Sequence, residues 1–541
     1  PASDNVIASP ARALQRRAAV LERMQQRGFV SVEDAARAQS EPLIGRDASA
    51  HFLAPHFTTR ALANMPAHMR GAQRTTLDLD LQTALEAEVR HTVATLRDRA
   101  AAHASAVVLD NQTGDVLAWV GSPDFFADTA GQVDMVTSRR QPGSALKPFL
   151  YGLAFDRGFT AATVLPDVPR TYATTTGSYQ PQNYDRRFRG PVRIREALAS
   201  SYNVPAVELV ERVGASSLLR TLHNAGFTSL TRSAEHYGLG LALGNGDVSL
   251  IELANGYRGI ANGGVWRSYR VLADAPVSGT GERRFMTTSS AALLLDILSD
   301  PVARMPGFGD ETPLDFPFRA ATKTGTSRHY TDNWAVAATA RFTVAVWVGN
   351  FSGRPMQKVS GITGAGPLLH RAVLETAKRY APGTLVDPER AGLTPASICI
   401  LSGMLATREC ASMIEWFAPG SEPRERDTWQ TGGSVTLPPE YAEWSAHNER
   451  RETIVVQRAT SKDVAQPRIL SPLSGDRYET LPGVDARYHT IPLLATKAEA
   501  VRWSVDGRPL GKSRWQMVKG THVIAARWAS GARDSVTVVV Q

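Results

Sequence analysis

The stretch RQPGSALKPF, residues 139–148, places a serine and a lysine on one face of a predicted helix. A Pro-Gly pair precedes Ser144, and the apolar residues after it recur at helical spacing. We therefore expect Ser144 at or beside a helix N-terminus, with Lys147 one turn later. Lysine is scarce: the chain has 8 lysines against 52 arginines, and only Lys147 and Lys323 precede residue 350. These two positions are expected to need something that arginine does not provide.

A lysine beside a serine can activate it as a nucleophile. A hydroxyl is a poor nucleophile until a base takes its proton, and a lysine amine can do so when burial or neighbouring cations lower its pKa from about 10.4. Arginine stays protonated and cannot serve. Backbone N–H groups at the helix start would also favour an oxyanion that develops near Ser144. Alone, Ser-x-x-Lys describes in most proteins a capped helix with an exposed lysine.

Two further motifs favour a catalytic role for Ser144 and Lys147 over a capped helix. KTGTS, residues 323–327, has the surroundings of a strand edge, where Gly325 would let a ligand approach the backbone closely. Between the lysine motifs, Ser201 and Asn203 flank a tyrosine in a Ser-x-Asn arrangement that supplies a hydroxyl and an amide. Each motif is common by chance, but the three in this order along the chain are hard to obtain by accident.

Periodicity divides the chain into helical, mixed and all-β parts. Residues 10–27 have helical spacing, and Ser31 with Asp34 marks the start of a second helix. A hairpin at 105–122 and a strand at 342–350, with helical stretches between them, predict an α/β domain with an antiparallel sheet and flanking helices. The last 75 or so residues alternate with period two, which predicts a small immunoglobulin-like β-sandwich. The expected fold class is multidomain α/β plus all-β, in five segments: an N-terminal helical part (1–45), a linker (46–72), the α/β domain (73–384), a Pro-rich connector (385–465) and the β-sandwich (466–541).

Composition narrows the classes of partner. The formal net charge is +8 and the sequence pI is about 9.5, which suits an acidic partner such as nucleic acid, anionic lipid or wall polymer. Because the arginines are scattered, only a general electrostatic bias follows from this charge. We expect no nucleic acid partner. The 12 histidines show no metal-ligand spacing, and we expect neither a metal nor a cofactor. No apolar run is long enough to span a bilayer, and the chain begins at Pro without a signal peptide. We therefore expect it to be part of a longer protein.

The two cysteines, Cys399 and Cys410, leave two interpretations open. They frame a short segment rich in Ser and Gly, which favours a disulfide that closes a small loop in an oxidising compartment. The alternative is a pair of small buried hydrophobic side chains. A zinc site would need more ligands than this segment offers.

The three motifs together resemble the signature of the penicillin-binding serine acyl-transferases: Ser-x-x-Lys, Ser-x-Asn and Lys-Thr-Gly. Longer stretches are similar to class A high-molecular-weight penicillin-binding proteins, with the strongest likeness to the 1C subtype, whose C-terminal β domain would correspond to residues from about 466. These stretches are RTTLDLDLQTALE, PQNYDRRFRGPVRIREALASSYNVPAVEL, YGLGLALGNGDVSLIELANGYRGIANGG and KTGTSRHYTDNWAVAATARFTVAVWVGNFSG. The resemblance implies a β-lactamase-like transpeptidase fold.

The resemblance also implies a role for each motif residue. Ser144 would attack the carbonyl of the penultimate D-Ala of a stem pentapeptide, with Lys147 as general base. Ser201 would relay the proton to the leaving amine, and Asn203 would orient Lys147 and hold the substrate amide. Lys323 would keep positive potential over the site.

The rest of the lysine-threonine-glycine motif would bind the substrate. The hydroxyls of Thr324 and Thr326 would receive the substrate carboxylate beside Gly325. The backbone N–H groups of Ser144 and Thr326 would form the oxyanion hole.

The family context implies a location and partners. Residues 1–45 resemble the tail of a peptidoglycan glycosyltransferase domain whose catalytic motifs this chain lacks, so only a longer parent would polymerise glycan. We expect a periplasmic protein anchored to the inner membrane by an N-terminal helix outside this sequence. Its expected partners are lipid II or nascent glycan, β-lactams and a periplasmic protein bound through 466–541.

Two other classes share the motifs. A penicillin-recognising sensor would only report acylation, and a D,D-carboxypeptidase or β-lactamase would deacylate with water instead of an amine. No residue resembles the deacylating glutamate of the β-lactamases. The last domain also has a plain alternative, in which it only stabilises its neighbour. Deleting it would separate that role from partner binding, by melting temperature and by pull-down.

Overall fold

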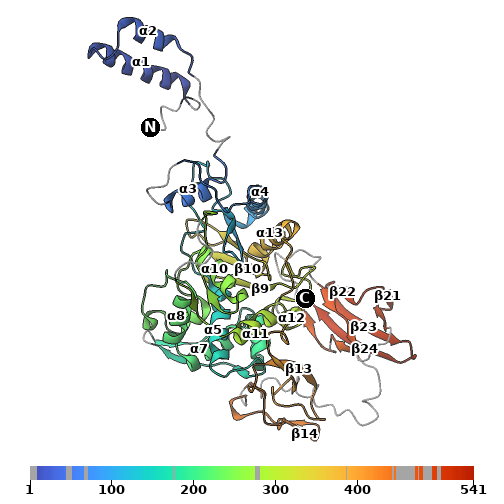
Figure 1. Cartoon of the computed structure of the whole chain (residues 1–541). Coiled ribbons are helices and arrows are strands. Elements are labelled where there is room, and N and C mark those ends of the chain that lie inside the picture. Colours follow the sequence, from blue (N-terminus) through green and yellow to red (C-terminus); the bar gives the residue numbers. More distant parts are fainter. Residues whose placement is uncertain are drawn as a thin grey trace. The chain divides into compact units, whose positions relative to one another are not determined.

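A computed structural model describes most of the chain (Figure 1). The described residues are 6, 9–43, 52–65, 71–174, 177–274, 281–385, 387–441, 444–445, 469–472, 474–478, 490–495 and 501–541. They separate into two compact units, Pro1–Thr59 and Arg60–Gln541.

The N-terminal unit contains the two predicted helices. α1 (Pro10–Gln26) begins with proline in its first turn, where a missing N–H costs nothing. α2 (Val32–Ser40) is capped by Ser31, whose side chain accepts a hydrogen bond from the N–H of Asp34, as the sequence predicted. The predicted linker 46–72 is not wholly irregular, because it contains α3 (Pro55–Ala63). Across the described ranges, no helix combines the length and apolar character needed to cross a bilayer.

A five-stranded antiparallel sheet forms the centre of the second unit. Its strand order is β2-β1-β11-β10-β9. The predicted hairpin and the predicted strand at 342–350 are both confirmed within it. The strands are β1 (His103–Asp110), β2 (Val116–Val120), β9 (Ala321–Thr326), β10 (Asp332–Ala338) and β11 (Phe342–Gly349).

Helices cover both faces of this sheet, which explains why its strands are almost continuously apolar. α4 (Leu79–Thr95) and α13 (Gly366–Arg379) pack on one face, where the alternate residues Val344, Val346 and Val348 point into their core. The other face carries α10 (Leu250–Ala261) and α11 (Thr288–Leu298), and α5 (Lys147–Asp156) packs against α11.

Shorter elements surround these layers. The helical ones are η2 (Arg97–Arg99), η3 (Gly143–Leu146), α6 (Ile194–Ala199), α7 (Asn203–Val213), α8 (Ala215–Asn224), α9 (Ala234–Tyr237), η4 (Gly238–Leu243), α12 (Pro301–Phe308), η5 (Arg328–Tyr330), η6 (Gly361–Ala365) and η7 (Pro439–Tyr441). The strands are β3 (Val164–Asp167) paired with β6 (Gly190–Arg193), β4 (Tyr172–Thr174) with β5 (Gly177–Tyr179), and β7 (Val265–Trp266) with β8 (Arg283–Arg284).

The connector is more ordered than its proline content suggested. It holds two hairpins: β12 (Thr394–Cys399) pairs with β13 (Ser412–Phe417), and β14 (Gln430–Thr431) pairs with β15 (Ser434–Val435). Cys399 and Cys410 form a disulfide bond, which confirms the first of the two interpretations. Within the described residues, the only cluster of three groups with metal-binding atoms adds Asp427 to these two cysteines, whose sulfurs are bonded to each other. Residues 446–465 of the predicted connector and residues 466–468 of the predicted β-sandwich lie outside the described residues.

The last part of the chain is all β. A five-stranded sheet in the order β17-β24-β23-β20-β21 is accompanied by the pairs β16-β19 and β18-β22. Trp503, Trp515 and Trp528 are buried in its core. The strands are β16 (Ile469–Ser471), β17 (Arg477–Tyr478), β18 (Thr490–Pro492), β19 (Leu494–Ala495), β20 (Val501–Val505), β21 (Arg508–Leu510), β22 (Arg514–Gln516), β23 (Gly520–Trp528) and β24 (Arg533–Val540).

Candidate active site

The Ser-x-x-Lys motif lies on a turn that packs backbone to backbone against the edge strand β9. Ser144 is in the 3-10 turn η3, directly before α5. A Cβ atom at Gly143, whose φ is +56°, would lie 2.4 Å from the carbonyl oxygen of Thr326. A Cβ atom at Gly325 would lie 2.1 Å from the carbonyl oxygen of Pro142. The sequence had assigned Gly325 to ligand approach, whereas the observed close approach is that of the serine-bearing turn.

Lys147 is the first residue of α5, and its ammonium reaches the Ser-x-Asn loop. Its side chain is fully buried. Nζ donates to the carbonyl oxygen of Ser201 at 2.6 Å, to that of Tyr202 at 2.8 Å and to Oδ1 of Asn203 at 2.8 Å. Three acceptors match the three N–H bonds of an ammonium. A neutral amine would release one of them and gain a lone pair.

Ser201 connects the two buried lysines. Its carbonyl group accepts from Lys147, and its hydroxyl oxygen accepts from Nζ of Lys323 at 2.7 Å. Lys323 also donates to the carbonyl oxygen of Thr324 at 3.0 Å. Ser201 has a left-handed backbone with φ of 63°, a conformation that costs a non-glycine residue on the order of 1–3 kcal/mol. The surrounding hydrogen bonds hold it there, so its carbonyl and its hydroxyl serve different lysines.

Burial perturbs both lysines. Desolvation, followed by the positive charge of Lys323, holds the pKa of Lys147 well below the usual lysine range, and Asp167 opposes that shift. Desolvation, followed by the charge of Arg304, lowers the pKa of Lys323 to about 7. A lysine with a lowered pKa can give up and accept a proton near neutral pH, which arginine cannot do. The site therefore contains two groups suited to proton transfer.

The threonines of the edge strand lie beside this centre. Thr324 and Thr326 are two residues apart on β9, so their side chains project from the same face of the strand. The hydroxyl oxygen of Thr326 accepts from the N–H of Gly361 at 2.8 Å, which leaves its O–H available as a donor. Two hydroxyls on one face form a suitable receptor for a carboxylate.

Two residues beneath the Ser-x-Asn loop had not been predicted. Asn183 accepts a hydrogen bond from the N–H of Asn203, and Asp167 accepts two hydrogen bonds from the side-chain amide of Asn183. Asp167 is fully buried. The only sequence signal for Asn183 is its place in the PQNYD stretch, and Asp167 has none.

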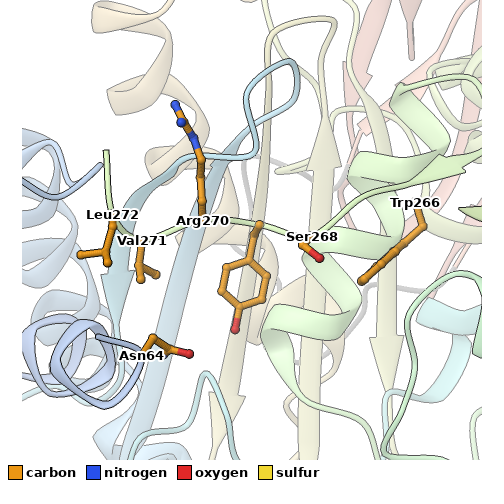
Figure 2. A pocket seen from close by; sticks show the side chains of 7 residues that line it. Asn64, Trp266, Ser268, Arg270, Val271 and Leu272 are labelled. Atoms are coloured by element: carbon orange, nitrogen blue, oxygen red, sulfur yellow. The ribbon is translucent and has the colours of Figure 1, made fainter. Parts of the chain in front are cut away.

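Figure 2 shows a separate surface pocket of about 340 Å³ that none of the motif residues lines. Asn64 and Trp266 contribute to it, and the guanidinium of Arg270 forms an ion pair with Asp115. This pocket is distinct from the site formed by the three motifs.

Comparison with known families matches two parts of the chain. Residues 104–353 match the penicillin-binding protein transpeptidase domain, and residues 456–539 match the penicillin-binding protein C-terminus family. The first match includes every motif residue described above.

Individual relatives agree with this result. Penicillin-binding protein 1C of Escherichia coli (strain K12) is 33% identical over 422 residues, which are 76% of this chain and 52% of that protein. Penicillin-binding protein 1A of Neisseria meningitidis (serogroup A, strain Z2491) is 30% identical over 273 residues, 47% of this chain and 33% of that protein. The chain thus spans about half the length of the first relative and a third of the second.

A solved structure shares the fold. The crystal structure of penicillin-binding protein 1A from Haemophilus influenzae superposes with a TM-score of 0.58 at 19% sequence identity, over 78% of this chain and 84% of that one.

Proposed function

Because the chain belongs to the penicillin-binding proteins, we propose that it is a serine D,D-transpeptidase that cross-links peptidoglycan stem peptides and is acylated by β-lactams. The observation that carries this proposal is the convergence of the three motifs. Lys147 contacts Ser201 and Asn203, Lys323 contacts the Ser201 hydroxyl, and the Ser144 turn packs on the strand that carries Lys323.

The first half of the reaction forms an acyl-enzyme. Oγ of Ser144 bonds to the carbonyl carbon of the penultimate D-Ala while neutral Lys147 takes the hydroxyl proton. The amide bond to the terminal D-Ala then breaks, and its nitrogen receives a proton through the Ser201 hydroxyl. The products are a serine ester and free D-Ala. The backbone N–H groups of Ser144 and Thr326 would hold the oxyanion.

The second half transfers the acyl group. An acceptor amine attacks the ester carbon, a new amide bond forms, the bond to Oγ of Ser144 breaks, and the proton lost by the amine returns to the serine. Lys323, Thr324 and Thr326 would hold the donor's terminal carboxylate during the first half. Asn203 would hold its amide while orienting Lys147.

The Cys399–Cys410 disulfide supports an oxidising compartment, and we place the described part of the chain in the periplasm. A membrane anchor and a glycosyltransferase activity in a longer protein both stay predictions.

A donor peptide ending in D-Ala-D-Ala, incubated with an acceptor amine, separates the three candidate functions. We expect D-Ala release together with an amide-joined product, both detected by mass spectrometry and both absent from Ser144→Ala. Release of D-Ala with only the hydrolysed peptide would indicate a carboxypeptidase. A persistent acyl-enzyme that has released a single equivalent of D-Ala, with neither the amide-joined peptide nor the hydrolysed peptide, would indicate a sensor.

A further inference from the structure

The start of α7 is held by a side chain from a distant loop. The N-cap residue of this helix, Tyr202, provides no side-chain cap. Instead, Oδ1 of Asn183 accepts from the first two helical N–H groups, those of Asn203 at 2.8 Å and Val204 at 3.2 Å. The free N–H groups at a helix start require acceptors, and here the acceptor is the side chain of a residue about twenty positions earlier in the chain. The position of the Ser-x-Asn loop therefore depends on Asn183.

Asp167 fixes the orientation of that amide. Nδ2 of Asn183 donates to the two carboxylate oxygens of Asp167 at 2.7 and 2.8 Å and to the carbonyl oxygen of Arg187 at 2.8 Å. A carboxylate only accepts, so it holds the NH₂ end of the amide toward itself and turns Oδ1 toward α7. The Asp167 side chain is fully buried, which makes this hydrogen-bonded arrangement costly to disrupt.

The same pair acts on the base of the proposed reaction in two ways. The acceptors of the Lys147 ammonium are the carbonyls of Ser201 and Tyr202 and the amide of Asn203, the residues that lead into α7. Moving the start of that helix would move all three. In addition, the negative charge of Asp167 favours the charged form of Lys147 and so opposes the lowering of its pKa.

Other charges also face this buried carboxyl. Arg189 and Asp185 approach from the loop that leads to β6, and Lys147 and Tyr151 approach from α5. Burial raises the pKa of Asp167 to about 6, while its hydrogen bonds from Asn183 and the charge of Arg189 oppose that rise. Asp167 is therefore mainly ionised above about pH 6, where its charge acts on Lys147.

We infer that Asp167 and Asn183 are positioning residues for acylation, Asn183 by holding the start of α7 and Asp167 by orienting Asn183 and by setting the charge around Lys147. This inference rests on the proposed function, because it assigns a task to residues behind the proposed base. Neither side chain is placed in contact with the substrate.

The test measures the rate of acylation by a fluorescent penicillin between pH 5.5 and 9.5, on the full chain. If neutral Lys147 is the base, the rate of the unaltered protein rises with pH to a plateau. Asp167→Asn removes the charge that favours the ammonium, so we expect the rising limb to move to lower pH by at least half a unit. Asn183→Ala keeps that charge but removes the acceptor for α7, so we expect the plateau to fall at least tenfold.

The matched control is Asp185→Asn, which removes a more exposed carboxylate that pairs with the same Arg189. It is expected to leave the pH of the rising limb in place and to change the plateau rate by no more than a factor of about two. A melting temperature for each variant separates loss of fold from loss of positioning.

Each outcome supports or overturns either the proposed function or the inference. An unaltered protein that is not acylated at Ser144 overturns the proposed function. A normally acylated protein whose Asp167→Asn limb does not move, or whose Asn183→Ala plateau stays within threefold, overturns the inference alone. If Asp167→Asn is recovered unfolded, the plateau of Asn183→Ala decides instead.

Discussion

Single residues set the chemistry of this site, and the two buried lysines do so through their charge. Both lie in surroundings that disfavour an ammonium, yet both meet oxygen acceptors from the Ser-x-Asn loop. Arginine would stay charged in such a place, which explains why an arginine-rich chain has lysine at 147 and 323. The structure thus gives a physical reason for lysine, instead of arginine, at these two positions.

Lys323 should reduce stability at neutral and acidic pH. Its folded pKa of about 7 lies below its usual value, so the unfolded chain binds the extra proton. This loss of unfolding free energy is complete below pH 7 and becomes smaller as the pH rises toward the pKa of the lysine in the unfolded chain. We expect Lys323→Met to raise the melting temperature more at pH 6 than at pH 9, with a difference on the order of 2 kcal/mol in unfolding free energy, while acylation slows at least a hundredfold.

The comparison for that variant is Lys378→Met, which removes an exposed lysine paired with Glu375. It should give the same change in melting temperature at both pH values. If Lys323→Met raises the melting temperature equally at pH 6 and pH 9, the pKa of Lys323 is not lowered in the folded protein.

The sequence singled out the motif residues as candidates but not Asp167 and Asn183. Ser144 and Lys147 are one helical turn apart, so their proximity follows from local geometry. Asp167, Asn183 and Asn203 meet only because β3, a loop and α7 come together in the fold. No spacing rule connects them, and a lone aspartate or asparagine in a loop carries no signal of its own.

At the scale of elements, α6 links the candidate active site to the connector. Arg195 on this helix is buried and donates to Glu415 on β13 at 2.8 Å and to Asp296 on α11 at 2.6 Å. α6 ends at Ala199, two residues before Ser201. The connector hairpin is thereby attached to the helix that leads into the Ser-x-Asn loop.

Breaking this pair should affect both stability and acylation. Glu415 is fully buried, and Glu415→Gln leaves the Arg195 charge without its main partner. We expect a loss of about 3 kcal/mol in unfolding free energy and a severalfold slower acylation. Denaturant unfolding and penicillin labelling would measure the two effects.

Glu375→Gln provides the reference, because Glu375 pairs with Lys378 at the surface and should contribute less than about 1 kcal/mol. If Glu415→Gln proves no more destabilising than Glu375→Gln, the connector does not support α6.

The connector also shows why its hairpins escaped prediction. Pro395 lies inside β12, and proline within an apolar run argues against a strand unless the strand is at an edge. β12 belongs to a two-stranded sheet, where such an edge exists. Its order comes from the disulfide and from Glu415, both of them tertiary features that composition does not reveal.

At the scale of the whole molecule, periodicity was a good guide to the sheets. The terminal β domain follows from period-two alternation, whereas the central antiparallel sheet follows from short β-rich runs and turn signals. The order of the central strands joins β1 to β11, more than two hundred residues apart, and that pairing could not be derived from local pattern. It is this long-range pairing that brings β9 and the Ser144 turn into one site.

The central claim is that these distant motifs form one acylating centre with Ser144 as nucleophile. The most direct measurement is to label the protein with a fluorescent penicillin, digest it and locate the adduct by mass spectrometry. The account predicts one adduct per chain on Ser144, none in Ser144→Ala, and losses in Lys147→Arg nearly as large as in Lys147→Ala, because both remove the neutral amine. An adduct on another residue, or labelling that survives Ser144→Ala, would contradict it.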